Sequence, residues 1–382
     1  MKNQSQQNIY DVIIIGGGLA GGTAAYFTAK SGLKTLLVEK EKLPRYKTCG
    51  GGLIYKSVNW LPFDLSNVIE KEFYRADVFV NDIGKNFAVE SSKPIVCTVM
   101  RDKFDNLILK NAMSVGAEIL DSTKIISVNI SNNLIEIKSL EQVFNCKYLI
   151  GADGATGITK GLFNESNSLL KVPTLESEVY VNNEIFIEFS LFPRFDFGIV
   201  PAGYAWVFPK KDHLSIGVLS LKKKINLNDF YRDYLSFLGI TTIFHEEKHG
   251  YFIPINPKKT ILSKNRVFLT GDANGLADPL TFEGISKAIL SGKLASDAIK
   301  KYFDNPQKAG EFYTNKIKRE ILYENKFAKI NVLFIYKKPV IRSFLFNWRG
   351  NIFTNLVTEV TLGSKQYSQL FKKSINYLKL FR

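Results

Sequence analysis

Residues that build metal sites and disulfide frameworks are scarce in this sequence. Its 382 residues include only three cysteines and three histidines, and no two cysteines have the CxxC spacing. An odd number of scattered thiols argues against a disulfide framework and against a zinc site. Few thiols are also typical of a reducing compartment. We therefore expect a cytoplasmic protein without a metal site.

One pair of histidines nevertheless has the spacing of zinc ligands. Residues 245–249 read His-Glu-Glu-Lys-His, a motif that in zinc proteases lies on a helix and brings both histidines to one face. Here β-branched residues precede the segment and Gly250 follows it, which predicts a turn between strands. We expect both histidines of the motif, and His213, to be surface residues.

Long hydrophobic runs are scarce as well. Residues 12–29 are uncharged and reach the minimum length of a membrane-spanning helix. The run contains five glycines, however, directly follows Asp11, and has only Lys2 as a basic residue before it. A signal peptide has a clearly basic front. We expect neither a spanning helix nor a signal peptide in this stretch.

The same stretch fits the beginning of a dinucleotide-binding fold. Residues 11–15 predict a buried strand, residues 23–30 a helix, and residues 35–38 a second buried strand. A glycine-rich turn joins the first strand to the helix. Strand, helix and strand within about 30 residues form a βαβ unit, so we expect a parallel sheet.

Three glycines and one acid complete the dinucleotide-binding fingerprint. Gly16 permits the tight turn, Gly18 lets the backbone approach a pyrophosphate, and Gly21 allows the helix to pack closely on the strand. The pyrophosphate then lies at the helix N-terminus. Glu39 ends the second strand 21 residues after Gly18, where its carboxylate can accept hydrogen bonds from a ribose. An acid there favours FAD or NAD over a cofactor with a 2′-phosphate.

Two later segments resemble the second and third flavin motifs of the para-hydroxybenzoate hydroxylase-like superfamily. They are Ile150-Gly-Ala-Asp153-Gly154-Ala and Val267-Phe-Leu-Thr-Gly271-Asp272-Ala-Asn-Gly275-Leu-Ala-Asp278-Pro279. The resemblance implies that FAD is the cofactor, that Asp272 holds its ribityl chain, and that the next helix points its N-terminus at the flavin. A helix N-terminus stabilises negative charge on a reduced flavin. The cofactor-binding residues that it implies are Asp153, Gly271, Asp272, Gly284, Ile285 and Arg101.

The rest of the chain predicts two interleaved units. A helix followed by a strand is expected within residues 101–120, and a strand followed by a helix within residues 266–303. Alternating segments between residues 166 and 255, including a strand at 185–190, predict an antiparallel sheet. The expected fold class is α/β, with a glutathione-reductase-type FAD-binding Rossmann domain interleaved with an antiparallel-sheet substrate domain, plus a helical C-terminal region. The expected boundaries are 1–60, 95–165 and 256–305 for the FAD-binding domain, 61–94 and 166–255 for the substrate-binding domain, and 306–382 for the C-terminal region.

Within this superfamily the sequence most resembles the geranylgeranyl reductase family, which saturates isoprenoid double bonds with reduced FAD. Three segments carry the resemblance: Arg45-Tyr-Lys-Thr-Cys49-Gly50-Gly51-Gly52, Tyr204-Ala-Trp206-Val-Phe208-Pro209-Lys210 and Asp278-Pro279-Leu-Thr-Phe282-Glu283-Gly284-Ile285. The resemblance implies that Arg45, Gly50 and Gly51 lie beside the flavin. Phe282 departs from the family, which usually has glycine there, and its side chain would narrow the pocket near the isoalloxazine ring.

Substrate-binding and catalytic candidates come from the same segments. Tyr204, Trp206 and Phe208 alternate along one strand and therefore face one side. The resemblance makes them, with Phe282, the wall of a channel for a prenyl chain, although an aromatic strand face on its own is more often sheet core. Cys49 is the catalytic candidate, because a thiol beside reduced flavin can protonate the carbon opposite hydride delivery. A packed, inert cysteine is the alternative.

The reaction that the resemblance implies is reduction of C=C bonds of an isoprenoid chain on a lipid or quinone. The external reductant is expected to be NAD(P)H or a ferredoxin-like donor, and the sequence has no second GxGxxG unit for a separate nicotinamide domain. One alternative is an FAD-dependent monooxygenase or halogenase of the same superfamily. The other is a membrane-associated electron-transfer flavoprotein, a class that normally carries an iron–sulfur cluster, which three cysteines cannot ligate in four-thiolate form.

Positive charge is concentrated near the C-terminus. The net charge is +15, and from Lys326 onward eleven basic residues oppose one acid, Glu359. Bulky apolar residues such as Trp348 accompany them, which fits peripheral contact with the inner face of a membrane. A helical cap on the substrate domain with a basic outer face is the alternative. We expect no nucleic-acid partner, since no recognised module accompanies the charge, and a monomer.

Overall fold

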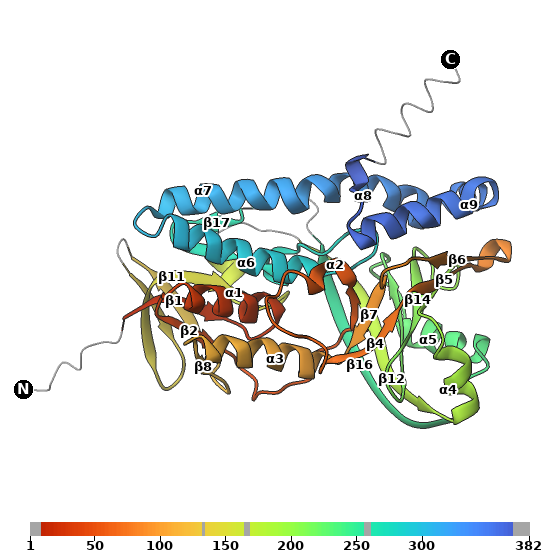
Figure 1. The fold of residues 1–382 in the computed structure, drawn as a ribbon, viewed down its shortest axis with the longest axis horizontal. Helices are drawn as coiled ribbons and strands as arrows, with labels where there is room; N and C mark the ends of the chain where they lie inside the picture. Colours follow the sequence, from red (N-terminus) through yellow and green to blue (C-terminus); the bar gives the residue numbers. More distant parts are fainter. Residues whose placement is uncertain (1–8, 132–133, 164–168, 256–260, 370–382) are drawn as a thin grey trace, which may run out of the picture.

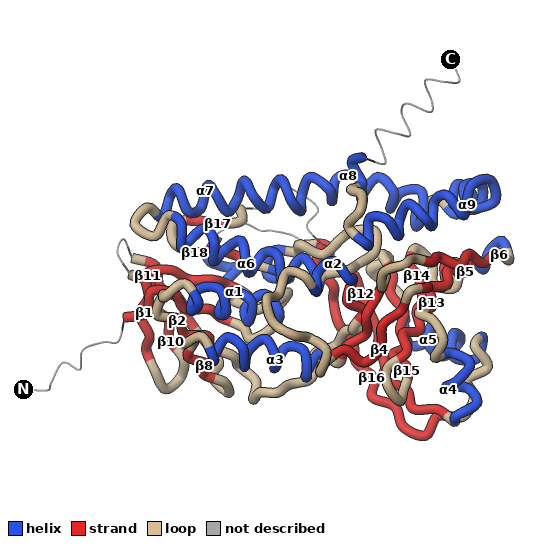
Figure 2. Tube along the Cα trace, viewed as in Figure 1, coloured by secondary structure: helices blue, strands red, loops and turns tan. Residues whose placement is uncertain are grey.

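The structure, a computed structural model, describes residues 9–131, 134–163, 169–255 and 261–369. The described part is elongated, with an eight-stranded sheet towards the N-terminus, a seven-stranded sheet towards the other end and a three-stranded sheet between them (Figures 1 and 2). The helices that follow the sheets in the sequence lie along one side of the molecule and reach over both larger sheets (Figure 1).

The eight-stranded sheet contains the predicted parallel strands. Its main path runs β17-β18-β11-β1-β2-β8, and the pairs from β18 to β8 are all parallel. The expected strands at 35–38 and 118–120 form with the predicted bounds. The strands are β1 (Ile9–Ile15), β2 (Thr35–Val38), β8 (Glu118–Leu120), β9 (Ser127–Ile130), β10 (Ile135–Lys138), β11 (Val143–Gly151), β17 (Ser263–Lys264) and β18 (Val267–Leu269).

Both faces of this sheet are covered, which explains why residues 12–15 of its central strand are all apolar. Val12 and Ile14 pack into one core with the helices, whereas Ile13 and Ile15 pack into another with the β9–β10 hairpin. A strand that is buried on both faces reads as a continuous hydrophobic run. The helices of the first core are α1 (Leu19–Lys30), α3 (Arg101–Ser114), α6 (Ile285–Lys301) and α7 (Pro306–Ile317).

The seven-stranded sheet has the order β16-β12-β15-β14-β13-β5-β6, and its pairs are antiparallel except β13 with β5. One of its faces packs on α4 (Asn183–Phe189) and α5 (Leu227–Phe237), and the other faces the C-terminal helices. The strands are β5 (Arg75–Val80), β6 (Lys85–Glu90), β12 (Leu170–Val181), β13 (Arg194–Phe197), β14 (Gly203–Pro209), β15 (Leu214–Ser220) and β16 (Ile243–Ile255).

The three-stranded sheet joins chain segments on both sides of a predicted domain boundary. Its order is β3 (Gly52–Ile54), β7 (Val96–Val99) and β4 (Ile69–Phe73), so it spans the expected boundary between 94 and 95. The expected boundaries at 165 and 256 fall among residues that the structure does not describe. The domain limits therefore stay predictions. The remaining short elements are α2 (Tyr55–Val58), η1 (Asn81–Ile83), η2 (Thr159–Phe163) and η3 (Gly271–Asn274).

Helices dominate the described part of the C-terminal region. After α7 follow η4 (Lys318–Leu322), α8 (Tyr323–Val332), η5 (Leu333–Lys337) and α9 (Pro339–Leu362). Within the described ranges, no helix is both long and apolar enough to cross a membrane. Four of the eleven basic residues counted above, Lys372, Lys373, Lys379 and Arg382, lie outside the described residues.

Three local predictions are wrong. The expected strand at 185–190 is helix α4, because the Asn182 side chain caps it by accepting a hydrogen bond from the Ile185 amide at 2.9 Å. The His-Glu-Glu-Lys-His segment is not a turn but part of β16, where it pairs along β12. His213 is not on the surface: it is 3 % exposed, and Glu178 and Asp212 satisfy its two ring nitrogens.

Candidate active site

A cavity of about 820 Å³ lies between the carboxyl end of β1, the aromatic face of the seven-stranded sheet and helix α9. Nearly all of the predicted site residues line it. Two do not: Gly21 and Gly271 lie behind its wall. The lining residues among the predicted set are Gly16, Gly18, Glu39, Arg45, Cys49, Gly50, Gly51, Arg101, Asp153, Tyr204, Trp206, Phe208, Asp272, Phe282, Gly284 and Ile285.

The glycine turn forms the nucleotide-binding end of the cavity. Gly16 has a φ of +106°, and Gly18 is the N-cap of α1 without a side-chain hydrogen bond to the helix start. Such a helix N-terminus presents backbone N–H groups to an anion. A Cβ at Gly21 would lie 1.9 Å from the Gly16 carbonyl oxygen, so this glycine allows helix and turn to touch. The Glu39 carboxylate accepts a hydrogen bond from the Gly17 amide at 2.7 Å.

Two guanidinium groups at the cavity wall share one buried carboxylate. Arg45 and Arg101 lie 3.3 Å and 2.8 Å from the oxygens of Asp105, which is 2 % exposed. Burial opposes the charge of Arg101, but Asp105 more than compensates and raises the pKa of the guanidinium above its ordinary value. Asp105 was not predicted as a site residue. It fixes both cations where they can face an anionic cofactor.

Asp272 lies in the middle of the cavity with two partners that the sequence did not reveal. The Tyr251 hydroxyl donates a hydrogen bond to Asp272 at 2.8 Å, and the Lys47 ammonium lies 3.3 Å from the centre of the Tyr251 ring. Burial lowers the pKa of Lys47 to about 8, an effect that Asp272 partly offsets. Lys47 lies inside the quoted Arg45–Gly52 motif, whereas no sequence signal singles out Tyr251 on its alternating strand.

The beginning of α6 points at the same part of the cavity. Gly284 is its N-cap, and the Glu283 carboxylate already accepts the Ser286 amide at 2.5 Å. Contacts with a cofactor at this helix end therefore fall to Gly284 and Ile285. Asp153, on the other side, accepts two hydrogen bonds from Thr159, and burial raises its pKa although these hydrogen bonds lower it.

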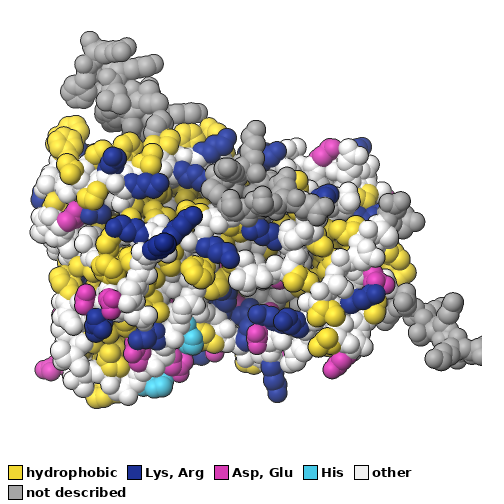
Figure 3. Space-filling model, turned by 180° about the vertical axis from the view of Figure 1, so that it is seen from behind, with side chains coloured by type: hydrophobic (Ala, Val, Ile, Leu, Met, Phe, Trp, Pro, Cys, Tyr) yellow, Lys and Arg dark blue, Asp and Glu magenta, His cyan; other side chains and the backbone are white. Residues whose placement is uncertain are grey.

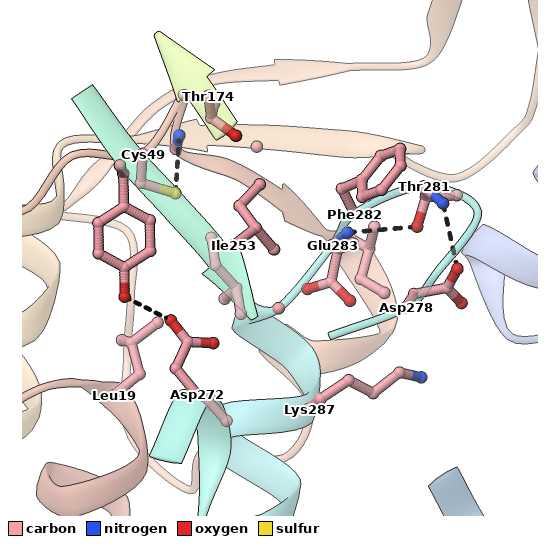
Figure 4. A pocket seen from close by; sticks show the side chains of 18 of the residues that line it. Leu19, Cys49, Thr174, Ile253, Asp272, Asp278, Thr281, Phe282, Glu283 and Lys287 are labelled. Atoms are coloured by element: carbon pink, nitrogen blue, oxygen red, sulfur yellow. Dashed lines mark hydrogen bonds between the residues drawn. The ribbon is translucent and has the colours of Figure 1, made fainter. Parts of the chain in front are cut away.

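The loop of Cys49 lies flat on the aromatic strand. A Cβ at Gly50 would come within 2.7 Å of the Trp206 indole nitrogen and 3.1 Å of the Phe208 ring. Lys210 fixes the loop through hydrogen bonds. It is fully buried and donates to the carbonyl oxygens of Gly50 and Val99, both at 2.8 Å. The thiol of Cys49, half-buried, faces the cavity across from Ile253 and Phe282 (Figure 4).

Aromatic side chains form one wall of the cavity. Tyr204, Trp206 and Phe208 line the cavity from one face of β14. Phe282 extends this wall, with its ring 6.0 Å from Tyr204 and 5.6 Å from Tyr336. Phe282 has a φ of +59°, a conformation that costs a residue with a side chain about 1–2 kcal/mol. This backbone explains why glycine is usual at the position.

The arrangement fits FAD. The uncapped start of α1 would bind the pyrophosphate, Glu39 would accept hydrogen bonds from the ribose, and the glycine loop at Cys49 would leave flat backbone for the ring system. The cavity also continues beyond the loop along aromatic side chains to α9. One end of the cavity thus suits a dinucleotide and the other an apolar substrate.

Comparisons with known proteins agree with this geometry. Residues 9–167 match the FAD binding domain family. The chain is 33 % identical to an uncharacterized protein of Methanosarcina barkeri over 86 % of this chain and 84 % of that one. It is 30 % identical to the digeranylgeranylglycerophospholipid reductase of Picrophilus torridus, with 84 % of each chain covered.

Solved structures share the fold. A geranylgeranyl bacteriochlorophyll reductase-like protein of Thermoplasma acidophilum has a TM-score of 0.75 and 24 % identity, covering 86 % of this chain and 88 % of that one. A flavin-dependent brominase has a TM-score of 0.71 and 17 % identity over 98 % of this chain and all of that one. The expected α/β fold and the FAD cofactor are confirmed. The chain belongs to the geranylgeranyl reductase family and is an FAD-dependent oxidoreductase.

Proposed function

We propose that this protein saturates C=C bonds of a geranylgeranyl-type isoprenoid chain carried by a lipid or a quinone. The observation that carries the proposal is the continuity of the cavity from the nucleotide-binding turn, past Cys49 and the aromatic wall, to α9. A long apolar chain needs such a path to bring an internal double bond to the flavin. The name of the Picrophilus relative, a digeranylgeranylglycerophospholipid reductase, supports a lipid-borne chain.

The protein's own residues position the chain and supply a proton. Bound FAD, once reduced, provides the hydride for one carbon of the double bond. The rings of Tyr204, Trp206 and Phe208 hold the chain and exclude water. An isolated alkene accepts hydride poorly, so this positioning supplies much of the acceleration. The other carbon takes a proton from the Cys49 thiol, and Arg101 stabilises the thiolate left behind.

The proposal is tested by product analysis under anaerobic conditions. Protein reduced with dithionite is mixed with digeranylgeranylglycerophospholipid in detergent, and the lipid is analysed by mass spectrometry. We expect masses that rise by whole pairs of hydrogen atoms. Cys49→Ala should retain FAD and slow this reaction about 100-fold, the usual contribution of a general acid. Unchanged turnover in Cys49→Ala would remove its proposed role.

Other products would decide against reduction. Oxygen in the product when the assay is run in air would assign the monooxygenase alternative, and halogenated product in the presence of halide would assign the halogenase. A lipid of unchanged mass, with quinone substrates also unchanged, would refute the proposal. Replacing dithionite by NADH, NADPH or reduced ferredoxin identifies the electron donor, for which we propose NAD(P)H or a ferredoxin-like protein.

We further propose that the outer side of α9 docks on an anionic membrane surface. Val340, Phe344 and Trp348 follow one another at four-residue intervals and are 82 %, 63 % and 62 % exposed. Ile352, 47 % exposed, lies beyond a kink of the helix at Arg349. Lys337, Lys338 and Arg349 lie exposed beside them. Hydrophobic and basic side chains also intermingle at the upper left of Figure 3, the side of the molecule on which α9 lies.

The opposite side of α9 lines the cavity. Phe346 and Phe353 face inward, so one helix separates the cavity from the exposed apolar stripe. A lipid-borne substrate that enters beside this helix would need little exposure to water. Apolar side chains inserted between headgroups and cations near anionic lipid both favour such docking.

Vesicle binding measures the docking. We expect the protein to sediment with phosphatidylglycerol-containing vesicles more than with pure phosphatidylcholine vesicles. The double variant Phe344→Ser/Trp348→Ser should bind at least about 100-fold more weakly, because each lost aromatic ring removes about 1.5–3 kcal/mol of burial. Ile187→Ser, at a 64 % exposed position on α4, is the control and should bind like the wild type. Equal binding by the double variant would refute the docking surface.

A further inference from the structure

Two buried carboxyl groups lie next to the cavity on the sheet that carries the aromatic wall. Glu176 and Glu178 alternate along β12 and therefore share a face, and they are 1 % and 3 % exposed. Glu176 lines the cavity. Two carboxyl groups this close cannot both ionise without a large cost in a buried site. The reaction as proposed above assigns neither of them a role.

A chain of hydrogen bonds connects this pair with the protein surface. The Asp212 side chain is 71 % exposed, and its Oδ1 lies 2.7 Å from Nδ1 of His213. Nε2 of His213 lies 3.1 Å from Oε2 of Glu178. Glu178 and Glu176 lie two residues apart on one face of β12, and their charges interact. The surface is thus linked to Glu176 through buried groups alone.

Tyr46 continues the chain toward the catalytic loop. Its hydroxyl donates a hydrogen bond to Oε2 of Glu176 at 3.0 Å, and its ring packs on His249 with 4.2 Å between ring centres. Tyr46 and Cys49 are three residues apart in one loop and line the same cavity. Burial, together with the charges of Glu176 and Glu178, raises the pKa of Tyr46, so its hydroxyl keeps its proton near neutral pH unless Glu176 replaces it.

The surrounding charges place a proton on the inner carboxyl group. Burial, and next to it the charge of Glu178, raise the pKa of Glu176 to about 8. Burial would raise the pKa of Glu178 as well, but the hydrogen bond from His213 and the charge of Lys210 bring it below its ordinary value. His213 also has a raised pKa, because its two acidic partners outweigh its burial. Near neutral pH Glu176 therefore carries a proton and Glu178 does not.

We propose that Asp212, His213, Glu178, Glu176 and Tyr46 form a proton relay that returns a proton to Cys49 from solvent after each reduction. The relay rests on the proposed function, since saturation of one double bond consumes one hydride and one proton. After Cys49 gives its proton to carbon, Tyr46 passes its hydroxyl proton to the thiolate and takes the proton of Glu176. His213 and solvent then reprotonate the carboxyl pair through Glu178, so no other reactant is needed.

The first test needs neither substrate nor flavin. The infrared carbonyl absorption of a protonated carboxylic acid is recorded for the flavin-free protein from pH 6 to pH 10. We expect a band that disappears as the pH passes about 8, and that is missing at all pH values in Glu176→Gln. Glu90→Gln is the control, because the Glu90 side chain is 69 % exposed, and it should leave the band in place. A band unaffected by Glu176→Gln would overturn the relay.

The second test follows product formation over successive turnovers, with dithionite in excess to reduce the protein again after each one. Glu176→Gln and Tyr46→Phe should retain FAD but saturate the prenyl chain about 100-fold more slowly in successive turnovers, the usual effect of losing a proton donor. The wild-type rate should fall above pH 8, a dependence that Glu176→Gln should lose. Wild-type rates in both variants would overturn the relay while leaving the proposed function intact. If the wild type itself reduces no prenyl chain, the proposed function fails and the infrared result alone decides whether Glu176 holds a proton.

Discussion

Gly21→Ala is expected to yield a protein that cannot retain FAD. A Cβ at this position would lie 1.9 Å from the Gly16 carbonyl oxygen and 3.2 Å from the Ala152 side chain, both part of the rigid turn and strand that meet the cofactor. Helix α1 must then move away from the turn, and its N-terminal amides leave the pyrophosphate position. Overpacking of this kind costs about 1–3 kcal/mol, and misplaced phosphate contacts add to it. We expect FAD affinity to fall at least about 100-fold.

The measurement is the flavin absorbance of purified protein together with FAD titration of the flavin-free form. Gly161→Ala serves as the matched control, because nothing lies within 4 Å of a Cβ built there. It should retain FAD like the wild type. A Gly21→Ala protein with full FAD content would show that the helix tolerates the shift and would contradict the assignment of the pyrophosphate to this turn.

Lys210→Met is expected to lower the free energy of unfolding by about 3–5 kcal/mol, the usual effect of removing one partner of a buried charge network. The ammonium group is fully buried and donates hydrogen bonds to the carbonyl oxygens of Gly50 and Val99. Its loss leaves both carbonyls without this donor and removes the cation that stabilises the Glu178 carboxylate. Methionine keeps most of the side-chain volume, so the effect reports hydrogen bonds and charge.

Urea unfolding measures this loss, with Lys211→Met as the control at the neighbouring exposed position. The control should stay within about 0.5 kcal/mol of the wild type. The double variant Lys210→Met/Glu178→Gln should recover part of the stability, because it also removes the unpaired anion. Loosening of the loop should speed alkylation of Cys49. Cys97 and Cys146 are fully buried, so their alkylation does not report on the loop. An unfolding free energy of Lys210→Met close to that of the wild type would contradict its supporting role.

Local sequence patterns were sufficient for the nucleotide-binding end of the site. The fingerprint glycines, Glu39 and the strands around them formed as predicted, because each depends on neighbours within about 30 residues. The alternation of Tyr204, Trp206 and Phe208 likewise sufficed to place three rings on one face of β14. Period and spacing are properties that a strand or helix retains in any fold.

Alternation and residue type were misleading at two places. Ile185, Ile187 and Phe189 alternate like a strand, yet the Asn182 cap made the segment a helix with Ile187 exposed and Phe189 buried. His213 became a buried residue because Glu178 on β12 lies at one ring nitrogen and the neighbouring Asp212 at the other. Asp212 is adjacent in the sequence, but Glu178 is 35 positions away and only the fold brings it to the histidine.

The sequence by itself therefore determined the cofactor-binding turn, the parallel sheet and the family, since these rest on short motifs with strict backbone requirements. Only the tertiary structure showed that α9 covers the cavity, that Lys210 supports the Cys49 loop, and that Glu176 and Glu178 share a face beside Tyr46. The physical reason is that burial and charge pairing join residues far apart in the sequence, such as Lys210 and Gly50, which are 160 positions apart. A buried charge acquires its partner, and with it its protonation state, only when the chain has folded.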